Sequence, residues 1–138
     1  MQILYNIGIL VLRAGIGLAA IFNPKAKEWI TGRKGQFKNL PDTKGSEVVW
    51  FHCASLGEFD QGLPLMHKLK TKKPSIFLLV TFFSPSGMKF YNKREHQADH
   101  VMYLPLDKKK NARRFMNHFK PTQAFFVKYE FWSNFIFE

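Results

Sequence analysis

Hydrophobic and polar positions follow two patterns along the chain, with the change near Gly45. Before it, residues 3–22 read ILYNIGILVLRAGIGLAAIF, an almost continuous apolar run. After it, short apolar runs rich in β-branched and aromatic residues alternate with longer amphipathic stretches, which is typical of strands that alternate with helices. The short runs predict strands over 48–54, 76–83, 101–104 and 123–128. The stretches between them predict helices over 58–71, 85–96 and 108–119.

The predicted strands are hydrophobic along their whole length, with little alternation between apolar and polar residues. This is expected of a parallel sheet that helices cover on both faces. The last predicted helix has apolar residues at helical spacing: Ala112, Phe115, Met116 and Phe119. We therefore predict an α/β fold with a Rossmann-like parallel sheet, preceded by an amino-terminal membrane-associated helix. Functional residues should lie beyond the carboxyl ends of the strands.

The apolar segment at the amino terminus has the length of a membrane span, because about 20 helical residues cross the hydrocarbon core. Arg13 lies near its centre, where a charge costs about 2.5–3.5 kcal/mol. The apolar residues roughly offset this cost, so the segment is either a marginal span or a helix lying in the membrane interface. Gly15, Gly17 and Ala20 formally match a dinucleotide-binding pattern, but close packing against a neighbouring element is the better interpretation.

The segment that follows is basic, and it separates the apolar helix from the predicted sheet. It contains six Lys and Arg residues but only two acidic residues, Glu28 and Asp42. This excess favours the cytoplasmic side of a membrane and attraction to anionic headgroups. We predict three parts, namely a membrane-associated helix (1–24), a basic linker (25–46) and a Rossmann-like domain (47–138).

The net charge, the histidines and the cysteine limit the kinds of partner and ligand that the chain can bind. The chain carries a formal net charge of +11 at pH 7, so large partners should be anionic. No nucleic-acid-binding motif is recognisable, and we predict an anionic membrane surface and no nucleic acid. His96 and His100, with Asp99, are the only histidine cluster, and we predict no metal site. Cys53 is predicted to be a buried thiol in a reducing compartment.

Ser55 and Glu58 directly follow the first predicted strand. Their spacing is that of a capping box, in which the serine and the glutamate satisfy amides at a helix start. A carboxylate at this edge of a parallel sheet is also well placed as a general base. Gly57 beside it would let a substrate approach the backbone closely. Both interpretations of Glu58 stay open at this point.

The loop after the second predicted strand offers a possible anion site. Ser84 and the proline after it form an ordinary helix start, which is the structural interpretation. The functional interpretation is an anion cradle made by the Thr81, Ser84 and Ser86 hydroxyls with the Gly87 amide. Glu130, after the fourth predicted strand, places another carboxylate at the same edge of the sheet.

Three longer motifs follow one another along the chain after residue 50. They read FHCASLGEFDQGLPLMHKLK, LLVTFFSPSG and YLPLDKKKNARRFMNHFKPTQAFFVKYEFWSN. Together with the stretch from Asn23 to Arg33, they resemble the motifs of the Kdo (3-deoxy-D-manno-octulosonic acid) transferase family. Their compatible spacing makes this resemblance specific.

The resemblance implies the amino-terminal acceptor domain of a GT-B glycosyltransferase at the cytoplasmic face of the inner membrane. Such enzymes are inverting, need no metal or other cofactor, and transfer Kdo from CMP-Kdo to lipid IVA in lipopolysaccharide synthesis. By resemblance, Glu58 is the general base and Glu130 a second active-site carboxylate. The sequence departs from the family pattern at Lys128, where Glu is common, and at Ser133, where Pro is usual.

The carboxyl terminus falls inside an apparent helix start, so we expect the chain to be part of a longer protein. The family's carboxyl-terminal domain supplies most contacts to the nucleotide sugar, and we therefore expect the 138 residues alone to be inactive. A different class of function also stays open. It is a non-catalytic, basic, membrane-peripheral binding domain in which the capping box is purely structural.

Overall fold

The computed structural model describes residues 2–128 and 130–138. Its elements in chain order are α1 (Gln2–Ala19), α2 (Pro24–Thr31), β1 (Val48–Cys53), α3 (Leu56–Lys72), β2 (Phe77–Phe82), α4 (Pro85–Phe90), the 3-10 helix η1 (Tyr91–Lys93), β3 (His100–Tyr103), α5 (Lys109–Phe119), β4 (Gln123–Val127) and α6 (Ser133–Phe137). The four predicted strands are confirmed, each boundary within one residue. The predicted α/β fold is confirmed with them.

The strands form one parallel sheet in the order β3-β2-β1-β4. Cys53, the last residue of β1, pairs with Phe82 on one side and with Val127 on the other, so three strands end level. The chain adds β2 and β3 to one side of β1 and then returns to place β4 on the other side. The carboxyl edge between β1 and β4 is therefore a topological switch point, where ligands of such sheets bind.

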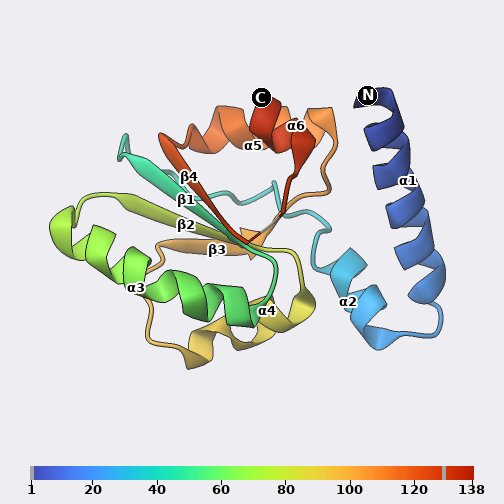
Figure 1. Cartoon of the computed structure of the whole chain (residues 1–138), viewed down its shortest axis with the longest axis horizontal. Helices are drawn as coiled ribbons and strands as arrows, with labels where there is room; N and C mark the ends of the chain where they lie inside the picture. The colour runs from blue at the N-terminus through green and yellow to red at the C-terminus, as the bar shows by residue number, and fades with distance from the viewer. Residues whose placement is uncertain (1, 129) are drawn as a thin grey trace.

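Helices cover both faces of the sheet, α3 and α4 on one face and α5 and α6 on the other (Figure 1). Successive residues of β1 face opposite layers, as the twofold period of a strand requires. Trp50 packs in the layer of Phe115, whereas Phe51 packs in the layer of Phe59. The uninterrupted hydrophobic runs of the sequence therefore reflect a sheet that is buried on both sides.

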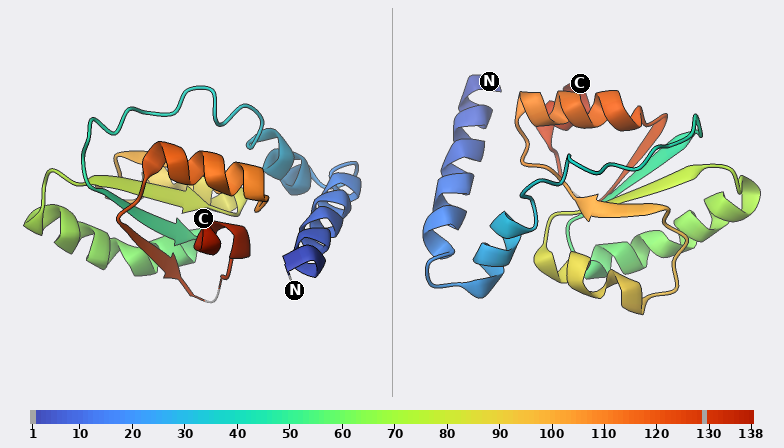
Figure 2. Two further views of the ribbon diagram at one scale, coloured as in Figure 1. Left: turned by 90° about the horizontal axis from the view of Figure 1, so that it is seen from above. Right: turned by 180° about the vertical axis from the view of Figure 1, so that it is seen from behind.

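α2 and then α1 lie beyond the carboxyl ends of the strands (Figures 1 and 2). Residues 25–46 thus hold more structure than the predicted linker. Asn23 starts α2, because its side chain accepts hydrogen bonds from the amides of Lys25 and Ala26, and Pro24 suits the first helical turn. The same break ends α1 earlier than the apolar run suggests, at Ala19.

The helix predicted over 85–96 is shorter than expected. α4 ends at Phe90 and η1 continues it to Lys93. Asp99 helps to hold the segment that follows: its carboxylate accepts a hydrogen bond from the Leu78 amide at 2.6 Å and pairs with Lys70 at 2.7 Å. These contacts tie the chain to the edge of β2 before β3 begins.

α1 is exposed on most of its surface. Ile9 is its buried residue, and large apolar side chains cover the rest of the helix: Ile3, Leu4, Ile7, Leu10, Val11, Leu12 and Leu18. By length and composition, it could cross a membrane. The apolar surface therefore faces away from the sheet domain.

Candidate active site at the carboxyl edge of the sheet

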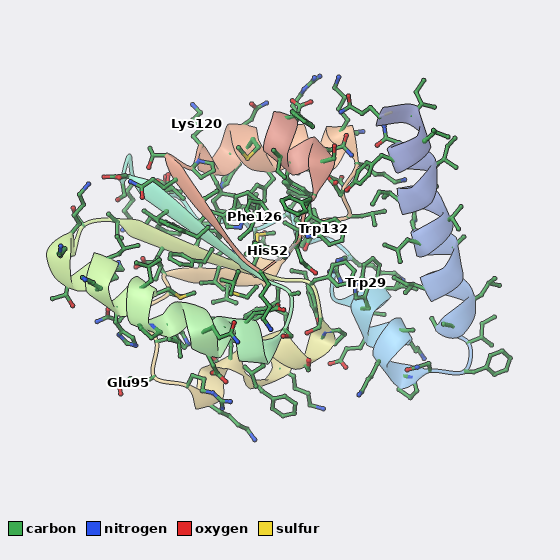
Figure 3. The ribbon with its side chains drawn as sticks, viewed as in Figure 1. Trp29, His52, Glu95, Lys120, Phe126 and Trp132 are labelled. Carbon is green, nitrogen blue, oxygen red and sulfur yellow. The ribbon has the colours of Figure 1, made fainter. Side chains whose placement is uncertain are left out.

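His52, near the end of β1, lies close to Trp132 (Figure 3). A row of hydrogen bonds runs from this point through the buried ends of β1 and β2. The Trp50 indole nitrogen lies 2.8 Å from the Thr81 hydroxyl, which lies 2.9 Å from Nδ1 of His52. An indole N–H can only donate, so Thr81 accepts from Trp50 and has its own hydrogen free for His52. His52 then carries its hydrogen on Nε2. All three side chains are buried.

The row ends at Glu130, in the segment after β4. Nε2 of His52 lies 2.7 Å from Oε2 of Glu130, and the Trp132 indole nitrogen lies 3.0 Å from the same oxygen. Burial raises the pKa of Glu130, but the hydrogen bonds from His52 and Trp132 outweigh it, and the pKa lies below its usual value. Its side chain remains 26% exposed. The structure therefore presents an oriented, ionised carboxylate at the switch point.

Glu58 lies on the first turn of α3, beside the end of β1. Its Oε2 accepts a hydrogen bond from the Ser55 amide at 2.8 Å, as the capping box predicts. A Cβ added at Gly57 would meet no atom within 4 Å, so the backbone there is open to a ligand. Burial raises the pKa of the Cys53 thiol, and the charges of Glu58 and Glu130 raise it further. The charges of both carboxylates therefore reach Cys53, the last residue of β1.

The loop after β2 contains part of the predicted anion cradle. The Ser84 hydroxyl accepts from the Gly87 amide at 3.2 Å and lies 3.0 Å from the Ser86 hydroxyl, so these three residues come together. Thr81 does not join them, because its buried hydroxyl is engaged by Trp50 and His52. Gly87 has a packing role, since an added Cβ would lie 2.2 Å from the Phe82 ring.

Arg33 fastens the segment after α2 to the same edge of the sheet. Its guanidinium donates to the carbonyl oxygens of Trp29, Phe83 and Leu104 at 2.8–3.0 Å. It also lies 3.8 Å from the centre of the Trp29 ring and 4.7 Å from that of Tyr103. Burial lowers the pKa of Arg33 to about 9. The charged group of Arg33 is therefore bound to backbone carbonyl groups inside the protein. It contributes less to the membrane-facing surface that the basic segment predicts.

Phe83 connects this anchor to the carboxylate site. Its ring stacks on Trp132 with centroids 5.0 Å apart and meets Trp29 edge-on at 5.5 Å. Trp132 in turn donates to Glu130. Aromatic packing therefore links α2 to the segment that carries the second carboxylate.

α1 contacts the domain through a polar stripe. The Tyr5 hydroxyl donates to the buried carboxylate of Asp107 and accepts from the Ser133 amide. Asn134 binds Asp107 through its amide and donates from its side chain to Asn6 at 3.0 Å. Burial raises the pKa of Asp107, although its hydrogen bonds partly counter this. The stripe ties α1 to α6, next to the segment of Glu130.

The described residues contain no group of three His, Cys, Asp or Glu side chains that could hold a metal ion. Asp99 is engaged by Lys70 and the Leu78 amide, and the His100 ring stacks on Phe119. Cys53 is buried and unpaired, as predicted for the single thiol.

Sequence reasoning missed His52, Trp132, Asp107 and the internal role of Arg33. His52 carried a usable signal, because it is the one polar side chain inside the apolar run VVWFHC, and such a residue needs a buried partner. Its partners Thr81 and Glu130 lie 29 and 78 residues away in sequence, so only the fold brings them together.

The fold and the site define an α/β domain that places two carboxylates at a topological switch point. Residues 29–138 match the family of 3-deoxy-D-manno-octulosonic-acid transferases. The chain belongs to this Kdo transferase family, a family of glycosyltransferases.

Three relatives illustrate the similarity. The 3-deoxy-D-manno-octulosonic acid transferase of Aquifex aeolicus is 33% identical over 99 residues, covering 72% of this chain and 27% of the relative. That of Haemophilus influenzae is 28% identical over 123 residues, covering 88% and 28%. A bifunctional glycosyltransferase/methyltransferase of Fusobacterium nucleatum is 29% identical over 116 residues, covering 83% and 18%. The chain thus spans little more than a quarter of the length of the first two.

Proposed function

We propose that this chain is the acceptor-side domain of a two-domain GT-B enzyme that transfers Kdo from CMP-Kdo to lipid IVA. The observation that carries the proposal is the pair of carboxylates, Glu58 and Glu130, at the carboxyl edge of β1 and β4. Family membership supports the transferase class, and the curated relatives are several times longer than this chain. Binding of the donor CMP-Kdo would therefore depend on a further domain, and the 138 residues alone would not catalyse the transfer.

In the proposed reaction Glu58 is the general base. It takes the proton of the acceptor hydroxyl while that oxygen forms a bond to the anomeric carbon of Kdo. The bond from this carbon to the CMP phosphate breaks on the opposite face, and its electron pair leaves with CMP. The configuration at the anomeric carbon inverts. General-base catalysis of this kind contributes typically about 10²–10⁴-fold to a rate.

Glu130 is proposed as a second active-site carboxylate that stays ionised. Its lowered pKa and its hydrogen bond from His52 support this role, because they hold its charge in a fixed direction. Ser55, Gly57, Ser84, Ser86 and Gly87 surround this edge. We propose that they bind anionic or hydroxyl groups of the substrates, with Thr81 acting through His52.

The position of α1 favours an interfacial helix over a membrane span. Tyr5 and Asn6 near its amino terminus contact α6 and Asp107, and Gly17 near its carboxyl terminus lines a cavity shared with α2. A helix that crosses the bilayer could not keep both contacts without drawing the polar domain into the hydrocarbon core. We propose that α1 lies in the cytoplasmic leaflet of the inner membrane and brings the catalytic edge to the lipid acceptor.

The test is Kdo transfer by the full-length protein. Purified protein, CMP-Kdo and lipid IVA should yield Kdo-modified lipid and free CMP, which mass spectrometry of the lipid product detects. CMP-sialic acid, which also carries a 2-keto sugar acid, is the matched donor control and should give no product. A full-length protein that binds anionic vesicles but transfers nothing from CMP-Kdo would favour the non-catalytic membrane-binding domain instead.

A further inference from the structure

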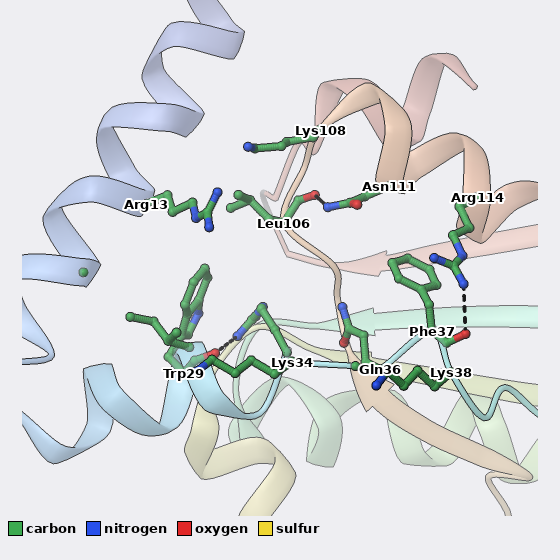
Figure 4. Close-up of a pocket in the computed structure, with 14 residues that line it drawn as sticks. Arg13, Trp29, Lys34, Gln36, Phe37, Lys38, Leu106, Lys108, Asn111 and Arg114 are labelled. Atoms are coloured by element: carbon green, nitrogen blue, oxygen red, sulfur yellow. Dashed lines mark hydrogen bonds between the residues drawn. The ribbon is translucent and has the colours of Figure 1, made fainter.

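A cavity of about 660 Å³ opens between α1, α2, the segment after α2 and the start of α5 (Figure 4). Its lining is strongly basic: Arg13, Arg33, Lys34, Lys38, Lys108 and Arg114. No carboxylate lines it, and none of these six side chains forms a salt bridge within residues 2–128 and 130–138. Basic side chains that converge without a counter-ion are a strong attraction for an anion.

Trp29 lines the cavity beside these basic side chains and is only 6% exposed. Its buried indole N–H finds no hydrogen-bond acceptor in the described part of the chain, which is costly in a folded protein. A phosphate in the cavity would be held by the lysines and arginines that surround it.

The surroundings of the cavity indicate where the phosphate comes from. Arg13 reaches the cavity from α1, whose other sides expose large apolar residues. A phosphate that enters beside this helix can therefore keep acyl chains attached on the apolar side. We infer that the cavity binds the phosphate group of an anionic phospholipid, an inference that rests on the proposed position of α1 in the membrane interface.

Arg33 and Arg114 are already engaged by backbone carbonyl groups, so the exposed lysines and Arg13 should contribute most of the attraction. The lysines on this surface are of two kinds, those that line the cavity and those that lie outside it. Lys34 and Lys108 line the cavity, whereas Lys109 and Lys110, next in sequence to Lys108, are exposed outside it. The two pairs form matched sets for substitution.

The experiment measures binding of the chain to vesicles of phosphatidylcholine with and without phosphatidylglycerol. The variants Lys34→Gln/Lys108→Gln and Lys109→Gln/Lys110→Gln lose the same net charge. We expect the first to reduce the phosphatidylglycerol-dependent affinity roughly tenfold and the second less than about threefold. Equal losses would mean diffuse attraction to the surface and would overturn the inference, as would no loss in either variant.

Two further experiments test whether α1 contributes to binding and whether the ligand is a lipid phosphate or a free anion. Arg13→Gln, which alters only α1, should also weaken the phosphatidylglycerol-dependent binding, whereas Lys25→Gln outside the cavity should not; the reverse order would contradict the inference. Inorganic phosphate, compared with chloride at equal ionic strength, should compete poorly. Complete displacement by phosphate would assign the cavity to a free anion. Because vesicle binding needs no sugar transfer, failure here leaves the proposed reaction intact, and loss of transfer leaves this inference intact.

Discussion

His52 shows how one buried side chain can orient a carboxylate at the edge of a sheet. It lies between the Thr81 hydroxyl and the Glu130 carboxylate, which accepts from its Nε2. Glu130 gains a fixed orientation from this arrangement. We therefore propose that His52 is a positioning residue and that Glu130, whose side chain is 26% exposed, is the group that reaches a substrate.

Replacing His52 tests this role. His52→Ala should lower the free energy of unfolding by about 1–3 kcal/mol, because Thr81 and Glu130 each lose a buried hydrogen-bond partner. His52→Gln, whose amide can accept from Thr81 and donate to Glu130, should recover part of this stability. Denaturant unfolding of the two variants measures the difference. Equal stability of His52→Ala and the unchanged chain would contradict the described hydrogen-bond row.

Asp107 should make stability depend on pH. Burial raises its pKa above the unfolded value, so the folded chain binds a proton more readily than the unfolded chain does. The stability contributed by this group therefore increases as the pH falls through the folded pKa. Asp107→Asn lacks the ionisation and keeps an oxygen for Tyr5.

The measurement compares unfolding of the unchanged chain and Asp107→Asn at neutral pH and in mild acid. The unchanged chain should gain stability relative to the variant as the pH falls. A relative loss of stability in acid would show that the pKa of Asp107 is lowered, against the described burial.

At the scale of elements, α2 and Arg33 close the carboxyl edge of the sheet. Arg33 donates to the carbonyl oxygens of Trp29, Phe83 and Leu104. These three residues are far apart in sequence, so Arg33 links separate segments of the chain. The close approach also needs Gly32, where an added Cβ would lie 2.2 Å from the Tyr103 ring. A short basic segment thereby becomes a structural part of the sheet domain.

Arg33→Lys should destabilise the chain by about 2 kcal/mol or more, because a lysine keeps the charge but cannot serve three carbonyl groups in a planar fork. Arg113→Lys is the matched control. Arg113 forms an exposed pair with Glu138, and its replacement should cost about 0.5 kcal/mol or less. Thermal unfolding compares them, and equal effects of the two substitutions would remove Arg33 from its anchoring role.

The elements of the sheet were predictable because their signals are local. The run VVWFHC contains enough apolar side chains to identify β1 without knowledge of its neighbours. α2 was not predicted, because PKAKEWIT has a single buried residue, Trp29, and otherwise reads as a charged linker. At the site, Ser55 and Glu58 were predictable from their spacing. The bond from His52 to Glu130 was not, because it depends on β4 pairing with β1.

At the scale of the whole molecule, three features meet on one side of the sheet. Glu58 and Glu130 follow the ends of β1 and β4. α1 and α2 lie beyond the carboxyl ends of the strands (Figure 1), and the basic cavity lies beside these two helices (Figure 4). Under the proposed function, a lipid acceptor held at the membrane would approach this side first. The arrangement supports the proposal that this domain handles the acceptor and that a further domain handles CMP-Kdo.

Glu58 has a structural task as a helix cap, so its proposed catalytic role must be separated from folding. Glu58→Gln keeps an oxygen that can accept from the Ser55 amide but cannot act as a base at neutral pH. Asp60→Asn, on the exposed side of the same helix, is the matched loss of a carboxylate.

The most direct measurement is the turnover number for Kdo transfer from CMP-Kdo to lipid IVA by the full-length protein and these two variants. We predict that Glu58→Gln folds and loses about 10²–10⁴-fold in turnover, whereas Asp60→Asn changes it less than about twofold. Turnover by Glu58→Gln equal to that of the unchanged protein would contradict the assignment of Glu58 as the catalytic base.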